Sequence, residues 1–164
     1  MPKDTRKQPV LSVVVPHRMA EPVRLVLERL KRSIGPGIRY QVITVAGNQP
    51  SVQRNMAVRG ARGKIIYFID NDSFVAPGSV ELALEIFRQD PGAAIVGGPS
   101  LTPGTDTFIQ RCFGLVLSSV FAVGPRIRSR YAPVGRRRMT DEFELILCNM
   151  FVRKDVFREA GGFD

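Results

Sequence analysis

The amino-acid sequence predicts an α/β fold with a mostly parallel sheet flanked by helices. Short apolar runs rich in β-branched residues alternate with amphipathic stretches, and loops containing Gly or Pro separate them. This alternation with short connections is typical of parallel strands covered by helices on both faces. The length of 164 residues, 44% of them apolar, suits one domain with a sizeable core. We expect a polar tail over residues 1–8 and a single domain over residues 9–164.

Four strands and three helices can be placed along the chain. We expect strands at residues 10–15, where Pro16 stops the apolar run, and at residues 40–45, 65–69 and 93–96. We expect helices that begin at Pro22, at Ser51 as an N-cap, and after Pro77-Gly78. The third strand is apolar at five consecutive positions, which indicates a central strand that is buried on both faces.

The central strand ends on Asp70-Asn71-Asp72. Ligands of open α/β sheets lie outside the carboxyl ends of the strands, so these residues stand where a site is expected. In an extended segment, positions i and i+2 point the same way, and the two carboxylates would face one divalent cation. Mg²⁺ or Mn²⁺ would suit such oxygen ligands, with substrate phosphates completing the shell. The alternative is a turn, in which Asp72 or Ser73 caps the following helix.

Polar residues also follow the first two predicted strands. His17, the one histidine of the chain, comes after the first strand, and Asn48 lies in the loop after the second. His17 either contacts a nucleotide or is a loop residue without a role. Arg54 lies near the start of the next helix, where it would pair with a phosphate or hold Asp70 in place.

Composition narrows the classes of function. The net charge of +9 implies an anionic partner, such as nucleotide phosphates, nucleic acid or an acidic membrane surface. Cys112 and Cys148 form no spaced cluster, so neither a zinc site nor a disulfide framework is expected, and a reducing cytosol fits them. No apolar run approaches the ~20 residues of a membrane span, and the polar N-terminus does not look like a signal peptide. The glycine patterns of dinucleotide-binding folds and of P-loops are absent from the sequence.

A set of motifs in fixed order resembles the family 2 glycosyltransferases of the GT-A fold. The motifs are the strand Leu11 to Pro16, Pro50-Ser51-Val52-Gln53-Arg54-Asn55, the segment Ala61 to Asp72, Pro77-Gly78, Val96-Gly97-Gly98-Pro99 and Ala160-Gly161-Gly162-Phe163-Asp164. The resemblance implies transfer of a sugar, with inversion, from a UDP-, GDP- or dTDP-sugar donor to a glycan or lipid-linked acceptor. It also implies Mg²⁺ or Mn²⁺ as cofactor, and a role in polysaccharide or cell-envelope biosynthesis.

The resemblance assigns roles to individual residues. Asp72 would hold the metal that bridges the donor diphosphate, and Asp70 would contact the ribose or the metal shell. Pro16, His17 and Arg54 would meet the nucleotide. Asn149 falls where the family commonly approaches the donor sugar and the acceptor.

Two departures from the family pattern stand out. The family usually carries an acidic residue after its second strand that holds the nucleotide base, and here Asn48 is the polar residue in that loop. The family also supplies an acidic pair after Gly-Gly-Phe-Asp, and one of its carboxylates is the general base. The sequence stops at Asp164, so we expect that the base lies downstream of it in a longer protein. Glu142 and Glu144 are the fallback candidates for the base.

Residues 105–138 combine an apolar stretch with a basic one. Apolar residues from Phe108 to Val123 predict a helix, which either packs on the core or on a part of the protein missing from this sequence, or lies in the plane of a membrane. Six arginines between Arg126 and Arg138 then form either a solvated loop or a contact to anionic lipid or a lipid-diphosphate acceptor. The protein is accordingly expected in the cytoplasm, free or peripheral at the inner face of the cell membrane.

Two other classes of function compete with the enzyme. One is a nucleotide-sugar-binding domain without turnover, which keeps every motif except the base. The other is a basic nucleic-acid-binding protein, although no known RNA- or DNA-binding module is present and we expect no nucleic-acid partner.

Overall fold

The computed structural model describes residues 8–164, which form two compact units. The first unit takes the described residues up to Val96 together with Phe151–Asp164, and the second unit is Gly97–Met150. Except for its last residue, the predicted tail of residues 1–8 lies outside the described part of the chain.

A five-stranded sheet is the centre of the fold. The strands are β1 (Leu11–His17), β2 (Tyr40–Ala46), β3 (Ile65–Phe68), β4 (Ile95–Gly97) and β5 (Met150–Arg153), and their order in the sheet is β2-β1-β3-β5-β4. β1 pairs in parallel with β2 and with β3. β5 is antiparallel to β4, because Gly98 N bonds Asn149 O while Arg153 N bonds Ala94 O. Sequence analysis missed β5, which enters between β3 and β4.

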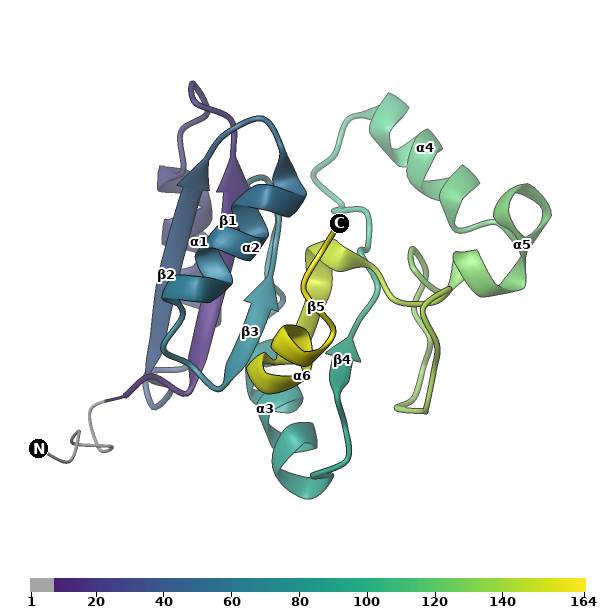
Figure 1. Ribbon diagram of the computed structural model, residues 1–164. Helices are drawn as coiled ribbons and strands as arrows, with labels where there is room; N and C mark the ends of the chain where they lie inside the picture. Colours follow the sequence, from purple (N-terminus) through teal and green to yellow (C-terminus); the bar gives the residue numbers. More distant parts are fainter. Residues whose placement is uncertain (1–7) are drawn as a thin grey trace, which may run out of the picture. The chain divides into compact units, whose positions relative to one another are not determined.

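Helices cover both faces of the sheet in the first unit. They are α1 (Arg24–Ser33), α2 (Pro50–Gly60), α3 (Ser79–Gln89) and the short α6 (Lys154–Glu159). In Figure 1, α2 and α6 lie in front of the sheet, and α1 and α3 lie behind it. The predicted α/β fold of mostly parallel strands flanked by helices is therefore confirmed.

The core follows from the alternation of side chains along the strands. Val13 and Val15 of β1 and Tyr67 of β3 belong to one buried cluster, together with Leu30 of α1 and Phe87 of α3. The opposite face is closed by aromatic contacts. The ring centroid of Phe68 lies 5.4 Å from that of Phe157 in α6 and 5.3 Å from that of Phe163. All four residues of β3 are buried, as the apolar run predicted.

One tight approach of two backbones fixes how β3 enters the sheet. A Cβ atom on Gly63 would lie 2.5 Å from the backbone carbonyl carbon of Leu11. Gly63 N instead donates to Oγ of the fully buried Ser12 at 2.9 Å. Only a residue without a side chain fits there.

The prediction that Pro16 ends the first strand was wrong, because β1 runs on to His17. Val14 O accepts from Ile69 N, whereas His17 O accepts from Gly47 N on the other side. The N–H and C=O groups of successive residues in a strand point alternately toward its two neighbouring strands. The backbone of Pro16 therefore faces the β3 side, as that of Val14 does. β3 pairs with β1 only as far as Val14, so the missing N–H of Pro16 costs no ladder bond.

Two predicted helix starts also differ. α1 begins at Arg24 rather than Pro22, with Val23 as N-cap. α2 begins at Pro50 with Gln49 as N-cap, so Ser51 lies inside the helix and caps nothing. The ring of a proline at the first helical position fixes its φ at a helical value. The helix therefore begins at Pro50, one residue before Ser51.

The second unit contains two helices where the sequence predicted one. α4 (Phe108–Leu117) carries a capping box between Thr107 and Gln110. α5 (Val120–Arg128) is kinked at Gly124, whose φ of 80° is left-handed and which precedes Pro125. A 3₁₀ turn, η2 (Leu147–Asn149), leads into β5. Among the described residues, no single helix is long and apolar enough to cross a membrane; α4 and α5 reach that length and composition only together, and they are bent by 67°.

Candidate functional site

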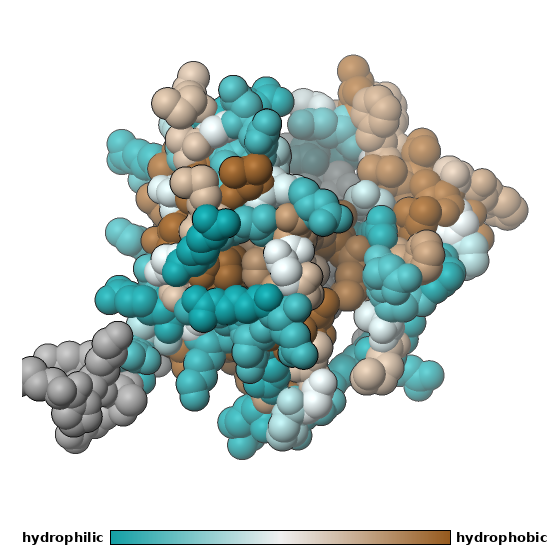
Figure 2. All heavy atoms as spheres, in the orientation of Figure 1, coloured by the Kyte–Doolittle hydropathy of each residue, from teal (hydrophilic) through white to brown (hydrophobic). Residues whose placement is uncertain are grey.

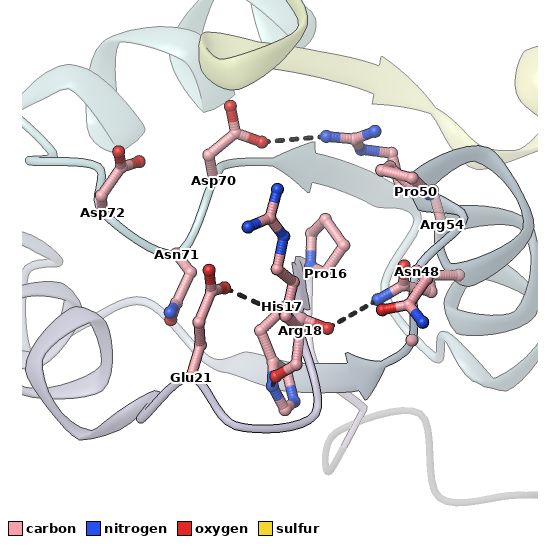
Figure 3. A pocket seen from close by; sticks show the side chains of 12 residues that line it. Pro16, His17, Arg18, Glu21, Asn48, Pro50, Arg54, Asp70, Asn71 and Asp72 are labelled. Carbon is pink, nitrogen blue, oxygen red and sulfur yellow. Dashed lines mark hydrogen bonds and ion pairs between the residues drawn. The ribbon is translucent and has the colours of Figure 1, made fainter.

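A cavity of about 530 Å³ opens at the carboxyl ends of the parallel strands in the first unit (Figure 3). Its lining comes from the loops after β1, β2 and β3 and from the start of α2. These residues are Pro16, His17, Arg18, Glu21, Gly47, Asn48, Pro50, Gln53, Arg54, Asp70, Asn71 and Asp72. The structure thus brings together six residues that the sequence predicted for the site: Pro16, His17, Asn48, Arg54, Asp70 and Asp72.

Arg54 and Asp70 form an ion pair at the back of this cavity. Arg54 Nη2 donates to Asp70 Oδ1 at 2.9 Å (Figure 3). The arginine side chain is 10% exposed and the carboxylate 46%. Arg54 is therefore a buried cation that fixes Asp70 on one side while the carboxylate still reaches the cavity.

Asp70, Asn71 and Asp72 form a turn instead of an extended segment. Ser73 N donates to Asp70 O, and Asp70 N donates to Ser73 Oγ, both at 3.1 Å. The i, i+2 argument that aligned the two carboxylates was therefore wrong, because it needs extended backbone. The turn that the sequence offered as the alternative is present, but neither Asp72 nor Ser73 caps the next helix, since Gly78 is the N-cap of α3. Asp72 is exposed on this turn and lines the cavity.

Helix α1 and the loop before it hold the turn from outside. Arg29 Nη1 donates to Asp72 O at 3.0 Å and to Ser73 O at 3.4 Å, and its guanidinium lies 3.4 Å from the ring centroid of Phe74. Asn71 Nδ2 donates to Pro22 O at 3.3 Å. Sequence reasoning missed Arg29, and no signal marks it, because an arginine on the polar side of a helix is ordinary.

A buried glutamine ties the ends of β1 and β2 together. Gln53 is 5% exposed, and its Nε2 donates to His17 O at 2.9 Å and to Val45 O at 2.6 Å. Gly47 N also donates to His17 O. Sequence analysis quoted Gln53 as part of a motif but gave it no role, although a polar residue buried beside a site is a usual sign of a positioning contact.

His17 has a defined ring orientation. Its Nδ1 lies 2.9 Å from Arg18 O, and a carbonyl oxygen only accepts, so Nδ1 carries the proton. Glu21 accepts from Arg18 N at 3.1 Å and so shapes the same loop. Asn48 is exposed at the mouth of the cavity.

The other predicted residues belong to the second unit. Asn149 Nδ2 donates to Pro99 O at 3.2 Å, and Asn149 O accepts from Gly98 N. Glu142 is exposed, and its backbone carbonyl accepts from Arg130. Glu144 contacts Arg138 and Thr140, and the hydrogen bond from Arg138 lowers the pKa of the Glu144 carboxyl. The roles of these three residues stay predictions.

The protein alone offers a divalent cation few ligands. Within residues 8–164, no group of three or more His, Cys, Asp or Glu side chains is arranged to hold a metal. Asp70 and Asp72 supply hard oxygen atoms, as Mg²⁺ and Mn²⁺ prefer. A cation at this turn would need further ligands from a bound phosphate or from water.

An α/β domain with a polar cavity at the carboxyl ends of its parallel strands belongs to the class that binds ligands at this edge of the sheet. The sequence matches the family described as "Glycosyl transferase family 2" over residues 22–161. The chain belongs to this family of glycosyltransferases. The matched range contains Arg54, Asp70, Asp72 and Asn149, while Pro16 and His17 precede it.

Solved structures show a more distant likeness. S. aureus TarS 1-349, also solved with UDP and with UDP-GlcNAc, is 14% identical, with a TM-score of 0.40 over 59% of this chain and 37% of that one. A197 from STIV is 15% identical, with a TM-score of 0.45 over 88% of this chain and 65% of that one. The chain thus spans less than two thirds of either structure, and at these scores we derive no function from them. No curated protein sequence matches the chain.

Proposed function

We propose that the cavity binds a nucleoside-diphosphate sugar and that the protein transfers the sugar, with inversion, to a glycan or lipid-linked acceptor. The observation that carries this proposal is the turn of Asp70 and Asp72, fixed by buried Arg54 at the end of β3, in a chain of glycosyltransferase family 2. The volume of about 530 Å³ lies within the range of sites for small-molecule ligands.

Mg²⁺ or Mn²⁺ fits the turn as a cofactor. Asp72 is exposed and would be the direct ligand, while Asp70, half of it open to the cavity, would contact the ion or the ribose. Because the described residues supply no third carboxylate or imidazole to this place, the diphosphate would complete the shell. When bound, such an ion neutralises negative charge that develops on the diphosphate leaving group.

The nucleotide would lie along the loops after β1 and β2. The Nδ1 of His17 is engaged with Arg18 O, so its other ring nitrogen, Nε2, would be the one to meet the nucleotide. The amide of Asn48 both donates and accepts, so it matches the edge of a base. Pro16 offers an apolar surface between them. Arg54 acts through Asp70, because its guanidinium is buried against that carboxylate.

Titration calorimetry with UDP and GDP, with and without Mn²⁺, tests the proposal. Asp72→Asn keeps the shape of the turn but removes a charged ligand, so we expect metal-dependent affinity to fall at least tenfold, about 1.4 kcal/mol. Affinity without metal should hardly change. Asp106→Asn in the second unit is the matched control and should behave as wild type. Equal affinity of wild type and Asp72→Asn in Mn²⁺ would exclude this metal assignment.

A nucleotide-sugar-binding domain without turnover is the second candidate. The ion pairs of Asp141 with Arg126 and of Glu144 with Arg138 favour it, because they engage acidic groups that would otherwise be available as a base. No specific feature favours the nucleic-acid-binding alternative. Measured binding together with absent transfer would identify the binding domain.

A further inference from the structure

The helices α4 and α5 present a continuous apolar surface to solvent. Neither helix contains a buried residue. The exposed side chains are Phe108 (74%), Ile109 (66%), Phe113 (64%), Leu115 (70%), Val116 (53%), Leu117 (37%), Val120 (46%) and Phe121 (102%). Figure 2 shows the corresponding brown spheres gathered over these two helices. We call these eight residues the apolar face.

The fold turns the apolar face outward. A Cβ on Gly114 would lie 2.0 Å from Thr102 Oγ1, so α4 packs closely on the preceding loop at this position. Arg128 Nε donates to Ser118 O at 3.0 Å and ties α5 to the end of α4. Gly114 and Ser118 are four positions apart and share one side of α4, together with Arg111. The helix is thus attached by its narrow polar side, and apolar residues occupy more than half of its circumference.

Basic residues follow the apolar face along the chain. From residue 107 to residue 140 the sequence has seven arginines and no acidic residue. Asp141 pairs with Arg126 and Glu144 pairs with Arg138. The guanidinium groups of Arg128 and Arg130 bond backbone carbonyls, which leaves their positive charge in place. Arg136 and Arg137 lie in an exposed loop with Met139, which is 87% exposed.

We propose that α4, α5 and the arginine loop dock onto the surface of an anionic lipid bilayer, with both helices lying in the plane of the interface. The wide apolar face fits immersion in the acyl boundary, where lipid surrounds most of a helix, better than a protein groove, which covers a narrow stripe. The arginines complement anionic headgroups at the same level. The bend of 67° and the short helices suit an interfacial position.

The sequence contains no tryptophan, so a single introduced indole reports on this surface alone. Phe121, the most exposed residue of the apolar face, is the position for this indole, in the variant Phe121→Trp. With phosphatidylglycerol vesicles at low salt, we expect a blue-shifted emission and quenching that is strongest for lipids brominated near the headgroup. Leu82→Trp, at a position of α3 that is 61% exposed, is the control and should show neither. Unchanged Phe121→Trp emission with these vesicles would overturn the proposal.

Co-sedimentation with vesicles separates the apolar part from the charged part. The double substitution Phe113→Ser with Phe121→Ser should lower the partition coefficient at least tenfold, whereas Leu82→Ser with Met56→Ser should leave it unchanged. Arg136→Gln with Arg137→Gln should lower binding to phosphatidylglycerol at low salt, and Arg59→Gln with Arg62→Gln should do so much less. Circular dichroism checks that each variant is folded.

A second copy of the chain is the rival occupant of the apolar face. Sedimentation velocity without lipid distinguishes the two. A monomeric wild type that binds vesicles supports the proposal. A dimer that Phe113→Ser with Phe121→Ser dissociates, together with no binding to vesicles at low salt, would overturn it.

Discussion

Arg54 fixes the position of Asp70 in the site. Its side chain is 10% exposed, and its ion pair with Asp70 is the charged contact that the structure gives it within the described residues. Removing one member of such a pair leaves the other charge buried without compensation, which costs more than the pair contributes. A neutral residue at position 70 would therefore destabilise the protein, because it leaves the Arg54 guanidinium buried without its anionic partner.

We predict that Asp70→Asn lowers the free energy of unfolding by about 1–3 kcal/mol. The loss stays below that of a fully buried pair because 46% of the Asp70 side chain is exposed and water partly replaces it. Asp72→Asn should cost much less, because Asp72 is exposed. Urea unfolding of both variants measures the difference. Equal stability of the two would show that Arg54 does not depend on Asp70.

Glu144 should titrate below the ordinary glutamate pKa of 4.5, because the hydrogen bond from Arg138 favours the carboxylate. A depressed pKa means that this contact stabilises the folded state above pH ~4.5 and loses its effect as the pH falls through the folded value. NMR of the side-chain carboxyl carbon gives the midpoint. Arg138→Gln should move it back upward, and an unchanged midpoint would contradict the assignment.

At the scale of elements, all four predicted strands were found close to where apolar runs placed them, although β4 begins two residues later than predicted. β1, β2 and β3 each carry a run of apolar and β-branched residues long enough to define a strand. β5 was missed because it is four residues long and pairs with β4 from more than 50 residues away. No local pattern reports such a pairing, and the same holds for the break at Ser118 and Ser119 that divides the predicted apolar helix into α4 and α5.

The turn after β3 depends on a contact from α1. We predict that Arg29→Met weakens metal-dependent nucleotide binding about 3–10-fold, because the carbonyls of Asp72 and Ser73 lose their donor and the turn relaxes. Nucleotide affinity without metal should stay nearly constant, which a general loss of stability would not produce. Arg24→Met, on the same helix but paired with Glu28, is the control. A parallel loss of both affinities would contradict a positioning role.

A substitution at Gly63 tests the close contact between β1 and the start of β3. Gly63→Ala places a methyl group 2.5 Å from the Leu11 backbone, which moves only if the strand moves. We expect a loss of about 2–4 kcal/mol in the free energy of unfolding, in the range of severe overpacking. Gly60→Ala has nothing within 4 Å and should be neutral or slightly stabilising. Thermal unfolding compares them, and similar transition temperatures would contradict the tight approach.

For the whole molecule, the sequence predicted where the site lies but not the contacts that position its side chains. Residues after three parallel strands meet at one edge of a sheet, so topology alone brings His17, Asn48 and Asp70 together. Gln53 and Arg29 position these loops through side-chain contacts to other elements. Such contacts between elements leave no pattern in the sequence, so they could not be predicted from it. The turn at Asp70-Asn71-Asp72 was missed because an extended backbone was assumed for it.

The last prediction concerns catalysis by the chain as a whole. We expect that it binds the donor but transfers sugar slowly. Inverting transfer needs a base that takes the acceptor proton, a contribution of typically 10²–10⁴-fold. Asp70 is held by Arg54, and Asp72 is proposed for the metal. The lowered pKa of Glu144 makes its carboxylate a weaker base.

Donor hydrolysis and product formation, measured beside calorimetric binding of the same donor, test this expectation. The supporting result is saturable binding with turnover near the uncatalysed background. Rapid turnover that Glu142→Gln abolishes, while donor affinity stays at the wild-type value, would contradict it and place the base on the exposed Glu142. The same loss in Glu144→Gln would place it there instead, since neither substitution touches the cavity in the first unit.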